Sequence, residues 1–187
     1  MLDTLITSKT RIKLLLKFFL NSKSKSYLRN LENEFGESTN SIRIELNKFE
    51  KAGLLKSELD GNKKFFRANT SHPLFNDIHN LLMKHIGFDK IIDKVINKLG
   101  NLNKVYVVGD FARGIDNHII DLIIVGNEVN KEYLLRLTEK TENLINRKIR
   151  YIVFSEVEFE SYISRLKDLE MILLWESEPS GIIDEET

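Results

Sequence analysis

The chain has 187 residues, of which 42% are hydrophobic, enough for one or two domains with a proper core. It contains no cysteine, which excludes disulfides, thiol nucleophiles and thiolate zinc sites. No segment approaches the roughly 18 apolar residues of a membrane span, and the N-terminus lacks a signal-peptide layout. We therefore expect a globular, cytoplasmic protein with no membrane association.

The charges are balanced overall but unevenly distributed. Lysine and arginine total 28, as do aspartate and glutamate, so the formal net charge is zero. Residues 1–70 carry 14 basic against 8 acidic side chains, and the remainder carries 14 against 20. This asymmetry favours a basic module that binds nucleic acid, joined to an acidic module. Chance segregation of surface charge is the alternative.

Three helices are predicted in the first third of the chain. Apolar residues recur at helical spacing over residues 8–20 and 27–35, and Gly36 follows the second segment where a left-handed cap is favoured. Ser38 is suited to cap a third helix. The inward face of that helix is predicted to comprise Ile42, Leu46, Phe49 and Gly53.

The outward face of the third helix carries side chains that can read DNA. Asparagine pairs with adenine, arginine pairs with guanine, and an exposed isoleucine can contact a thymine methyl group. The predicted base-contacting residues are Asn40, Arg43, Ile44, Asn47 and Lys51. The predicted phosphate contacts from the same helix are Thr39, Ser41 and Lys48. The alternative is an ordinary solvated helix face.

A β-hairpin is predicted directly after these helices. Residues 54–59 and 63–68 are β-like runs joined by Asp60-Gly61-Asn62, and Asp-Gly is a strong hairpin signal. The hairpin tip carries Lys63 and Lys64, which suit the phosphate backbone. Three helices and a hairpin form a winged helix. The run FEKAGLLKSELDGNKKFFRAN resembles winged helix-turn-helix repressors of the bacterial arsenic-repressor and multiple-antibiotic-resistance type.

This resemblance covers about residues 5–70 and implies double-stranded DNA as a partner. Many domains of this kind bind only proteins, which remains an alternative. Residues 71–100 continue an apolar stripe, with Gly87 as a break between two helices. A stripe too large for one small domain predicts a homodimer, unless it packs only within its own chain.

Four histidines, His72, His79, His85 and His118, raise the question of a metal site. His79 and His85 are six residues apart and fall on different helix faces. Neither has a second histidine at the i, i+4 spacing of the metalloprotease helix. We therefore expect no metal site.

The stretch VYVVGDFARGIDNHIIDLIIVG, residues 105–126, holds an apolar strand, a glycine-bracketed turn and a second apolar strand. It resembles the signature of minimal nucleotidyltransferases of the DNA polymerase beta superfamily: Gly-Ser, any residue, Ala-Arg-Gly, a short loop, then Ser-Asp-Ile-Asp-Leu. The matching residues are Gly109, Ala112, Arg113, Gly114, Ile120, Asp121 and Leu122. The resemblance implies a relic nucleotide-binding site comprising Gly109, Asp110, Arg113, Gly114 and Asp121.

Several positions depart from this signature. Asp110 stands at the phosphate-binding serine, His118 at the later serine and Ile119 at the first metal-binding acid. Residues 148–154 offer Arg150 but no third acid. Asp121 alone cannot hold two Mg²⁺ ions, so only the relic Asp121 remains of the catalytic set.

The acids of this stretch have other roles open to them. Asp110 or Asp116 can be considered as substitute metal ligands. Alternatively, Asp110 caps a helix and Asp121 forms a salt bridge, for example to Arg113.

The sequence thus predicts an α+β protein: a winged helix-turn-helix at 1–70, a helical linker and dimerisation element at 71–100, a nucleotidyltransferase-like domain at 101–178, and a disordered acidic tail at 179–187. Within the third part we expect a helix at 131–146, a strand at 147–154, a helix at 156–164 and an apolar element at 169–175. The segment ENLINRKIRYIVFSEVEF also resembles the region after the signature in winged-helix proteins fused to this domain.

The predicted function is transcription regulation by DNA binding, with the degenerate domain sensing a small-molecule or protein effector and with no cofactor. One alternative is a Mg²⁺-dependent nucleotidyltransferase that modifies a protein, RNA or small molecule. Another is that both halves bind other proteins.

Overall fold

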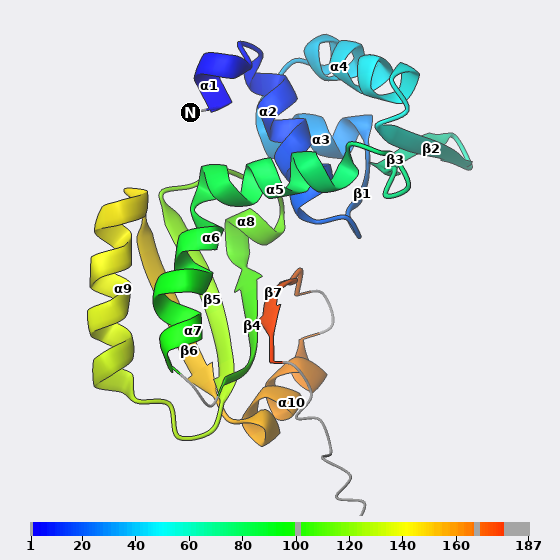
Figure 1. The fold of residues 1–187 in the computed structure, drawn as a ribbon. Coiled ribbons are helices and arrows are strands. Elements are labelled where there is room, and N and C mark those ends of the chain that lie inside the picture. The colour runs from blue at the N-terminus through cyan, green and yellow to red at the C-terminus, as the bar shows by residue number, and fades with distance from the viewer. Residues whose placement is uncertain (1, 100–101, 167–168, 178–187) are drawn as a thin grey trace, which may run out of the picture.

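The computed structural model describes residues 2–99, 102–166 and 169–177, and it combines helices with two β-sheets (Figure 1). The tail predicted for residues 179–187 lies outside the described residues. Among the helices of the described segments, none is both long and apolar enough to cross a membrane. The mixture of α and β structure agrees with the fold class expected from the sequence.

The N-terminal part contains the predicted helices and hairpin. Ser8 caps its second helix by accepting a hydrogen bond from the Arg11 N–H, and Ser38 caps its fourth through the Ser41 N–H. Its elements are α1 (Leu2–Leu5), α2 (Lys9–Leu15), the π-helical η1 (Leu16–Leu20), β1 (Lys25–Tyr27), α3 (Leu28–Phe35), α4 (Thr39–Lys51), β2 (Leu55–Asp60) and β3 (Lys63–Ala68).

The three strands of this part form an antiparallel sheet in the order β1-β3-β2. Gly61 takes a left-handed φ of 57° at the hairpin tip, which favours glycine there. Strand β1, between η1 and α3, was not predicted from the sequence. Ile42, Leu46 and Phe49 of α4 are buried, which confirms the inward face predicted for that helix.

The linker forms α5 (Phe75–Ile86), α6 (Phe88–Ile91), the π-helical η2 (Ile92–Ile96) and α7 (Asn97–Leu99). Gly87, at φ 96°, separates the first two as predicted. Most of the apolar stripe is buried within the single chain, because α5 packs on η1 while α6 and η2 pack on α9. Leu82, Ile86 and Ile91 have no exposed surface. The premise that the stripe needs a second copy to cover it is therefore wrong.

The C-terminal part is built on a four-stranded sheet in the order β6-β5-β4-β7, in which only β5 and β6 are parallel (Figure 1). Helix α10 packs on β5 and β6, and its Phe159 ring stacks on Tyr106 of β4. The elements are β4 (Leu102–Val108), α8 (Gly109–Ala112), β5 (Ile119–Gly126), α9 (Lys131–Ile145), β6 (Lys148–Phe154), α10 (Glu156–Arg165) and β7 (Ile172–Glu176).

The N-terminal and C-terminal parts are in direct contact. The Asn21 side chain donates a hydrogen bond to the Ala112 carbonyl oxygen (3.1 Å). The linker also contacts the N-terminal part, because a His79 ring nitrogen of α5 lies 2.8 Å from the Phe19 carbonyl oxygen. The short α8 turn therefore lies beside η1, and the buried apolar residues of both parts form one continuous cluster.

Candidate functional sites

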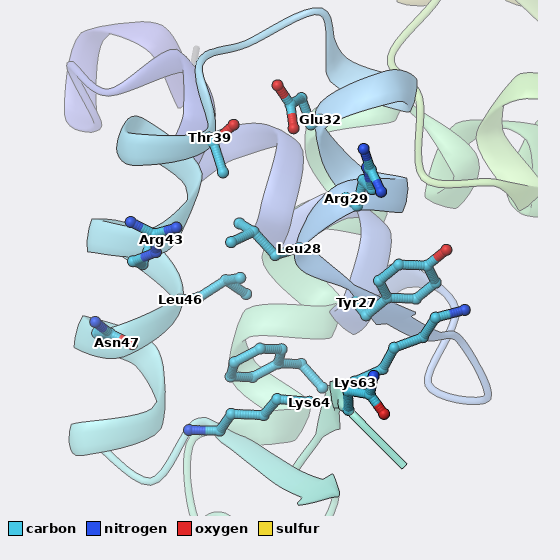
Figure 2. Close-up of a pocket in the computed structure, with 12 residues that line it drawn as sticks. Tyr27, Leu28, Arg29, Glu32, Thr39, Arg43, Leu46, Asn47, Lys63 and Lys64 are labelled. Atoms are coloured by element: carbon cyan, nitrogen blue, oxygen red, sulfur yellow. The ribbon is translucent and has the colours of Figure 1, made fainter. Parts of the chain in front are cut away.

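Helices α3 and α4 and the β2–β3 hairpin enclose a cavity of about 550 Å³, which we call the α3–α4–hairpin groove (Figure 2). All three elements contribute side chains to its wall. The lining residues are Tyr27, Leu28, Arg29, Glu32, Thr39, Arg43, Leu46, Asn47, Asn62, Lys63, Lys64 and Phe66.

The groove is positively charged at its rim. Four of the lining residues are cationic and one, Glu32, is acidic. Lys64 is paired with Glu50 (2.7 Å), whereas Arg29 and Arg43 have no hydrogen-bond or ion-pair partner among the described residues. The Lys63 ammonium lies 4.6 Å from the centre of the Tyr27 ring, a cation–π distance. Two arginines are therefore free to bind an anion.

Glu50 fixes the position of the hairpin against α4. It accepts hydrogen bonds from Lys64 and from the Ser57 hydroxyl (2.5 Å). These hydrogen bonds, that from Lys64 first, hold the pKa of the Glu50 carboxyl below its usual value. Because Glu50 stays ionised, it holds Lys64 at the groove.

The residues predicted to bind DNA fall into two sets. Thr39, Arg43, Asn47, Lys63 and Lys64 line the groove. The others lie on α4 outside it: Asn40, Ile44, Lys48 and Lys51 are exposed, and Ser41 is half-buried.

Two residues of that second set already have partners within the chain. The Ser41 hydroxyl is hydrogen bonded to that of Ser38 (2.8 Å). Lys48 is paired with Glu45 (3.1 Å), which also binds Arg11. These two side chains are less free to contact phosphate than the prediction assumed.

Seven of the twelve groove residues lie outside the set predicted to bind DNA, and three of these carry polar groups on or beside α3. They are Tyr27, Arg29 and Glu32, and the sequence analysis predicted this helix without assigning binding residues to it. Arg29 and Glu32 are three residues apart and so share a helix face, which is the signal that identifies them. Tyr27 carries no comparable signal, because its position depends on the pairing of β1 with β3.

The glycine-bracketed turn of the C-terminal part is held by its own side chains. Asp110 accepts hydrogen bonds from Arg113 and from the Asn117 amide (2.6 Å). These contacts, led by that of Asn117, outweigh burial and lower the pKa of the Asp110 carboxyl. The expectation that Asp110 caps a helix is wrong, because α8 begins at Gly109, its N-cap residue is Val108, and no side chain caps it.

Asp121 forms a two-pronged ion pair with Arg150 on the neighbouring strand. The Arg150 Nε and Nη2 atoms donate to the two carboxylate oxygens at 2.6 and 2.9 Å. The parallel register of β5 and β6 places these two residues directly opposite each other. Arg113, suggested as the partner of Asp121, instead pairs with Asp110.

The space around this ion pair is small. A cavity of about 290 Å³ is lined by Val108, Gly109, Asp121 and Arg150, together with apolar residues. A Cβ atom at Gly109 would lie 2.7 Å from an Asp121 carboxylate oxygen, so the backbone there passes directly beside the acid. Ile119 is half-buried on the same strand face as Asp121 and adds no ligand.

Asp116 does not join Asp110 and Asp121 in a metal site. It pairs with Arg147 (2.7 Å) and lies 3.7 Å from the His85 Nε2 atom. Each of the three aspartates is thus bound by a different arginine. In the parts of the chain that the structure describes, no group of three His, Asp or Glu side chains is arranged to hold a metal ion.

Gly114 has a packing role. A Cβ atom there would lie within 2.6 Å of the Lys17 backbone nitrogen and still closer to its Cα atom. The residue also takes a left-handed φ of 78°. Gly114 therefore allows the α8 turn to approach η1, and it faces the N-terminal part instead of the cavity beside Asp121.

No protein-family model matches this chain, and no curated protein matches it significantly. Among solved structures, a mutant of the toxin–antitoxin pair MntA–HpeT shares 15% identity over 49% of this chain and 74% of that chain, with a TM-score of 0.38. A protein from Sulfolobus solfataricus described as a nucleotidyltransferase candidate shares 26% identity over 50% and 82%, with a TM-score of 0.35.

A third structure, a candidate transcriptional regulator for arsenical resistance, shares 21% identity over 45% of this chain and 77% of that chain, with a TM-score of 0.30. All three TM-scores are too low to establish a shared fold. The function of this chain is therefore inferred from its own side chains.

Proposed function

We propose that the chain binds double-stranded DNA through a winged helix-turn-helix formed by residues 1–70 and acts as a transcriptional regulator. The observation that carries this proposal is the convergence of Arg43, Lys63 and Lys64, from a helix and a hairpin, on one cationic groove. Convergence of cations from separate elements is what a helix in the major groove with a wing on the backbone requires.

Helix α4 and the hairpin are suited to different parts of DNA recognition. Asn40, Arg43 and Asn47 are exposed, and their amide and guanidinium groups can form two-pronged contacts with adenine and guanine. Lys63 and Lys64 belong to the hairpin and supply charge for phosphates, which sets affinity but not sequence preference. A homodimer that places two such helices one DNA turn apart remains part of the proposal.

We infer that the C-terminal part is a nucleotidyltransferase-like domain that does not transfer nucleotides and instead senses a ligand or protein partner. Three features support this: Ile119 replaces one acid, Arg150 stands where another is needed, and Asp121 is neutralised by Arg150. Two Mg²⁺ ions bring four positive charges and need several carboxylates to hold them. The close approach of Gly114 to the Lys17 backbone brings this domain into direct contact with the proposed DNA-binding part.

DNA binding is tested with a labelled duplex taken from upstream of the chain's own gene. The duplex is titrated with the wild-type protein and with the double variant Arg43→Ala, Lys63→Ala. We expect the double variant to weaken binding by about a hundredfold, since each lost contact contributes about 1–3 kcal/mol. Lys140→Ala with Arg165→Ala removes the same charge from exposed positions on α9 and α10 and should leave affinity nearly unchanged. Equal losses in both variants, or no binding by the wild type, would reject the proposal.

Nucleotide transfer is tested by incubating the protein with labelled ATP, GTP, CTP or UTP and Mg²⁺. We expect no label on the protein itself, on added RNA or on any component of an added cell lysate, because the acids needed to hold the metal are missing. Transfer that is lost in Asp121→Ala would establish the enzyme instead.

A further inference from the structure

The tip of the β2–β3 hairpin carries the one aspartate of the sequence that is followed by glycine, in the pair Asp60-Gly61. Both residues are exposed, and the hairpin projects from the rest of the chain (Figure 1). A backbone nitrogen that belongs to glycine can approach the preceding side chain closely, because no neighbouring Cβ atom stands in the way. This pair therefore has a chemistry of its own, separate from its role in the turn.

The Asp60 carboxylate has no hydrogen-bond or ion-pair partner within the part of the chain that the structure describes. Lys63 lies directly opposite it in the strand ladder, but the Lys63 ammonium lies over the Tyr27 ring instead, 4.6 Å from its centre. The aspartates described above in the C-terminal part are, by contrast, each held by an arginine. The Asp60 side chain is therefore free to turn toward its own backbone.

The Gly61 N–H donates no hydrogen bond to any described residue. Because Asp60 pairs with Lys63, Gly61 and Asn62 are the two central residues of the turn. Gly61 has a φ of 57° and the φ of Asn62 is not positive, which defines a type II′ turn. A turn of this kind is closed through the N–H of its fourth residue, so the nitrogen of its second residue, Gly61, stays available as a nucleophile.

We propose that Asp60 converts to isoaspartate in the folded protein, through a cyclic succinimide formed with Gly61. The Gly61 nitrogen attacks the Asp60 Cγ atom, and a C–N bond forms while the carboxyl hydroxyl leaves as water together with the amide proton. Water then opens the ring. Attack at Cγ restores aspartate, whereas attack at the backbone carbonyl carbon leaves the chain running through Cβ and Cγ. The water lost in the first step is regained in the second, so no oxidant or cofactor is needed.

The surroundings of the turn admit both steps. A Cβ atom added at Gly61 would have nothing within 4 Å, so ring closure displaces no packed side chain. A hollow of about 340 Å³ lies at this tip, and solvent water can enter it. It is lined by Asp60, Gly61, Asn62, Lys63 and Phe65. Water can therefore reach the ring that the first step forms.

The product changes the hairpin itself. An isoaspartyl residue adds one atom to the main chain of a two-residue loop, and loop length sets the turn type and the strand register. The pairs Asp60–Lys63 and Leu59–Lys64 at the tip are then displaced, and the two lysines move with them. Weaker DNA binding by the converted protein rests on the proposed function, whereas the modification does not.

The modification is tested by keeping the folded full chain in H₂¹⁸O at neutral pH for as long as a synthetic peptide of residues 57–63 needs to convert by half. Digestion with trypsin then follows in ordinary water. Mass spectrometry should find ¹⁸O and an isoaspartyl linkage at Asp60. The exposed Asp77 should stay unlabelled, because the Ile78 N–H is bound to the Leu74 carbonyl oxygen (3.0 Å).

Two variants identify the ring. Asp60→Glu keeps the charge but cannot form a succinimide, so it should gain no label. Asp60→Asn should form isoaspartate severalfold faster than the wild type, since a neutral amide is attacked more readily than a carboxylate. Circular dichroism confirms that each variant is folded. A folded wild type without label at Asp60, or with equal label at Asp77, would overturn the proposal.

The consequence for DNA is measured by anisotropy of the labelled duplex with incubated wild type and incubated Asp60→Glu. The wild type should lose DNA-binding protein in proportion to its isoaspartate content, and Asp60→Glu should lose none. Unchanged DNA binding by the converted protein refutes this consequence alone. Isoaspartate in a chain that does not bind DNA when fresh refutes the proposed function and leaves the modification standing.

Discussion

Asp121 and Arg150 decide what the nucleotidyltransferase-like motif can do. The carboxylate that would hold a metal is bound by both prongs of a guanidinium group, at 2.6 and 2.9 Å. The same contact raises the pKa of Arg150, so the arginine stays charged throughout the physiological range. A cation that approaches Asp121 has to displace Arg150 and finds no second acid at Ile119.

Restoring the acids should therefore restore metal binding. In the double variant Ile119→Asp, Arg150→Asp, the carboxylate introduced at position 119 lies on the same strand face as Asp121, about 6–7 Å from it along the strand. The loss of Arg150 also frees Asp121 from its ion pair. We expect this variant to bind Mn²⁺ in a calorimetric titration while the wild type does not. Leu144→Asp with Arg165→Asp makes the same charge change on exposed surface and should not bind. Equal Mn²⁺ affinity in wild type and restored variant would contradict this expectation.

Among the elements, the contact between the α8 turn and η1 joins the two parts of the chain. Gly114 permits it because a side chain there would meet the backbone of Lys17. Lys17 itself is 3% exposed and paired with Glu34 of α3 (3.1 Å), which links the turn to the helix that lines the groove. The turn that resembles a nucleotide-binding loop thus serves as a joint in this chain.

Gly114→Ala should be strongly destabilising. The left-handed φ costs an alanine about 1–2 kcal/mol, and the overlap with backbone adds about 1–3 kcal/mol because Lys17 cannot easily shift. Gly36→Ala is a matched control, since Gly36 has a similar φ of 61° with nothing within 4 Å of the added Cβ atom. In urea unfolding, we expect Gly114→Ala to lose clearly more stability than Gly36→Ala. Equal losses of stability in the two variants would mean that Gly114→Ala acts only through backbone strain and not through the contact with Lys17.

Local patterns predicted most elements, while contacts between elements were not predictable. The sequence located α4 with its inward residues, the hairpin, the Gly87 break and the strands around residues 105–126. It could not pair Asp121 with Arg150, because that depends on the register of two strands separated by a helix. The same limit explains why the linker stripe was taken for an uncovered surface and why the contact of Gly114 was missed.

Across the molecule, the two halves differ in charge and in what their polar groups do. In the C-terminal part, Asp110, Asp116 and Asp121 each neutralise an arginine. In the N-terminal part, Arg29 and Arg43 have no such partner within the described residues. Two unpaired arginines therefore lie at the α3–α4–hairpin groove, where an external anion can neutralise them.

Contact between this groove and DNA phosphates is best measured through the salt dependence of duplex binding. For each phosphate contact, log K falls by about 0.9 per unit of log salt concentration. We predict that Lys63→Ala and Lys64→Ala each reduce this slope by about one, while Lys140→Ala on α9 leaves it unchanged. Identical slopes in all four proteins would show that the groove does not contact the phosphates.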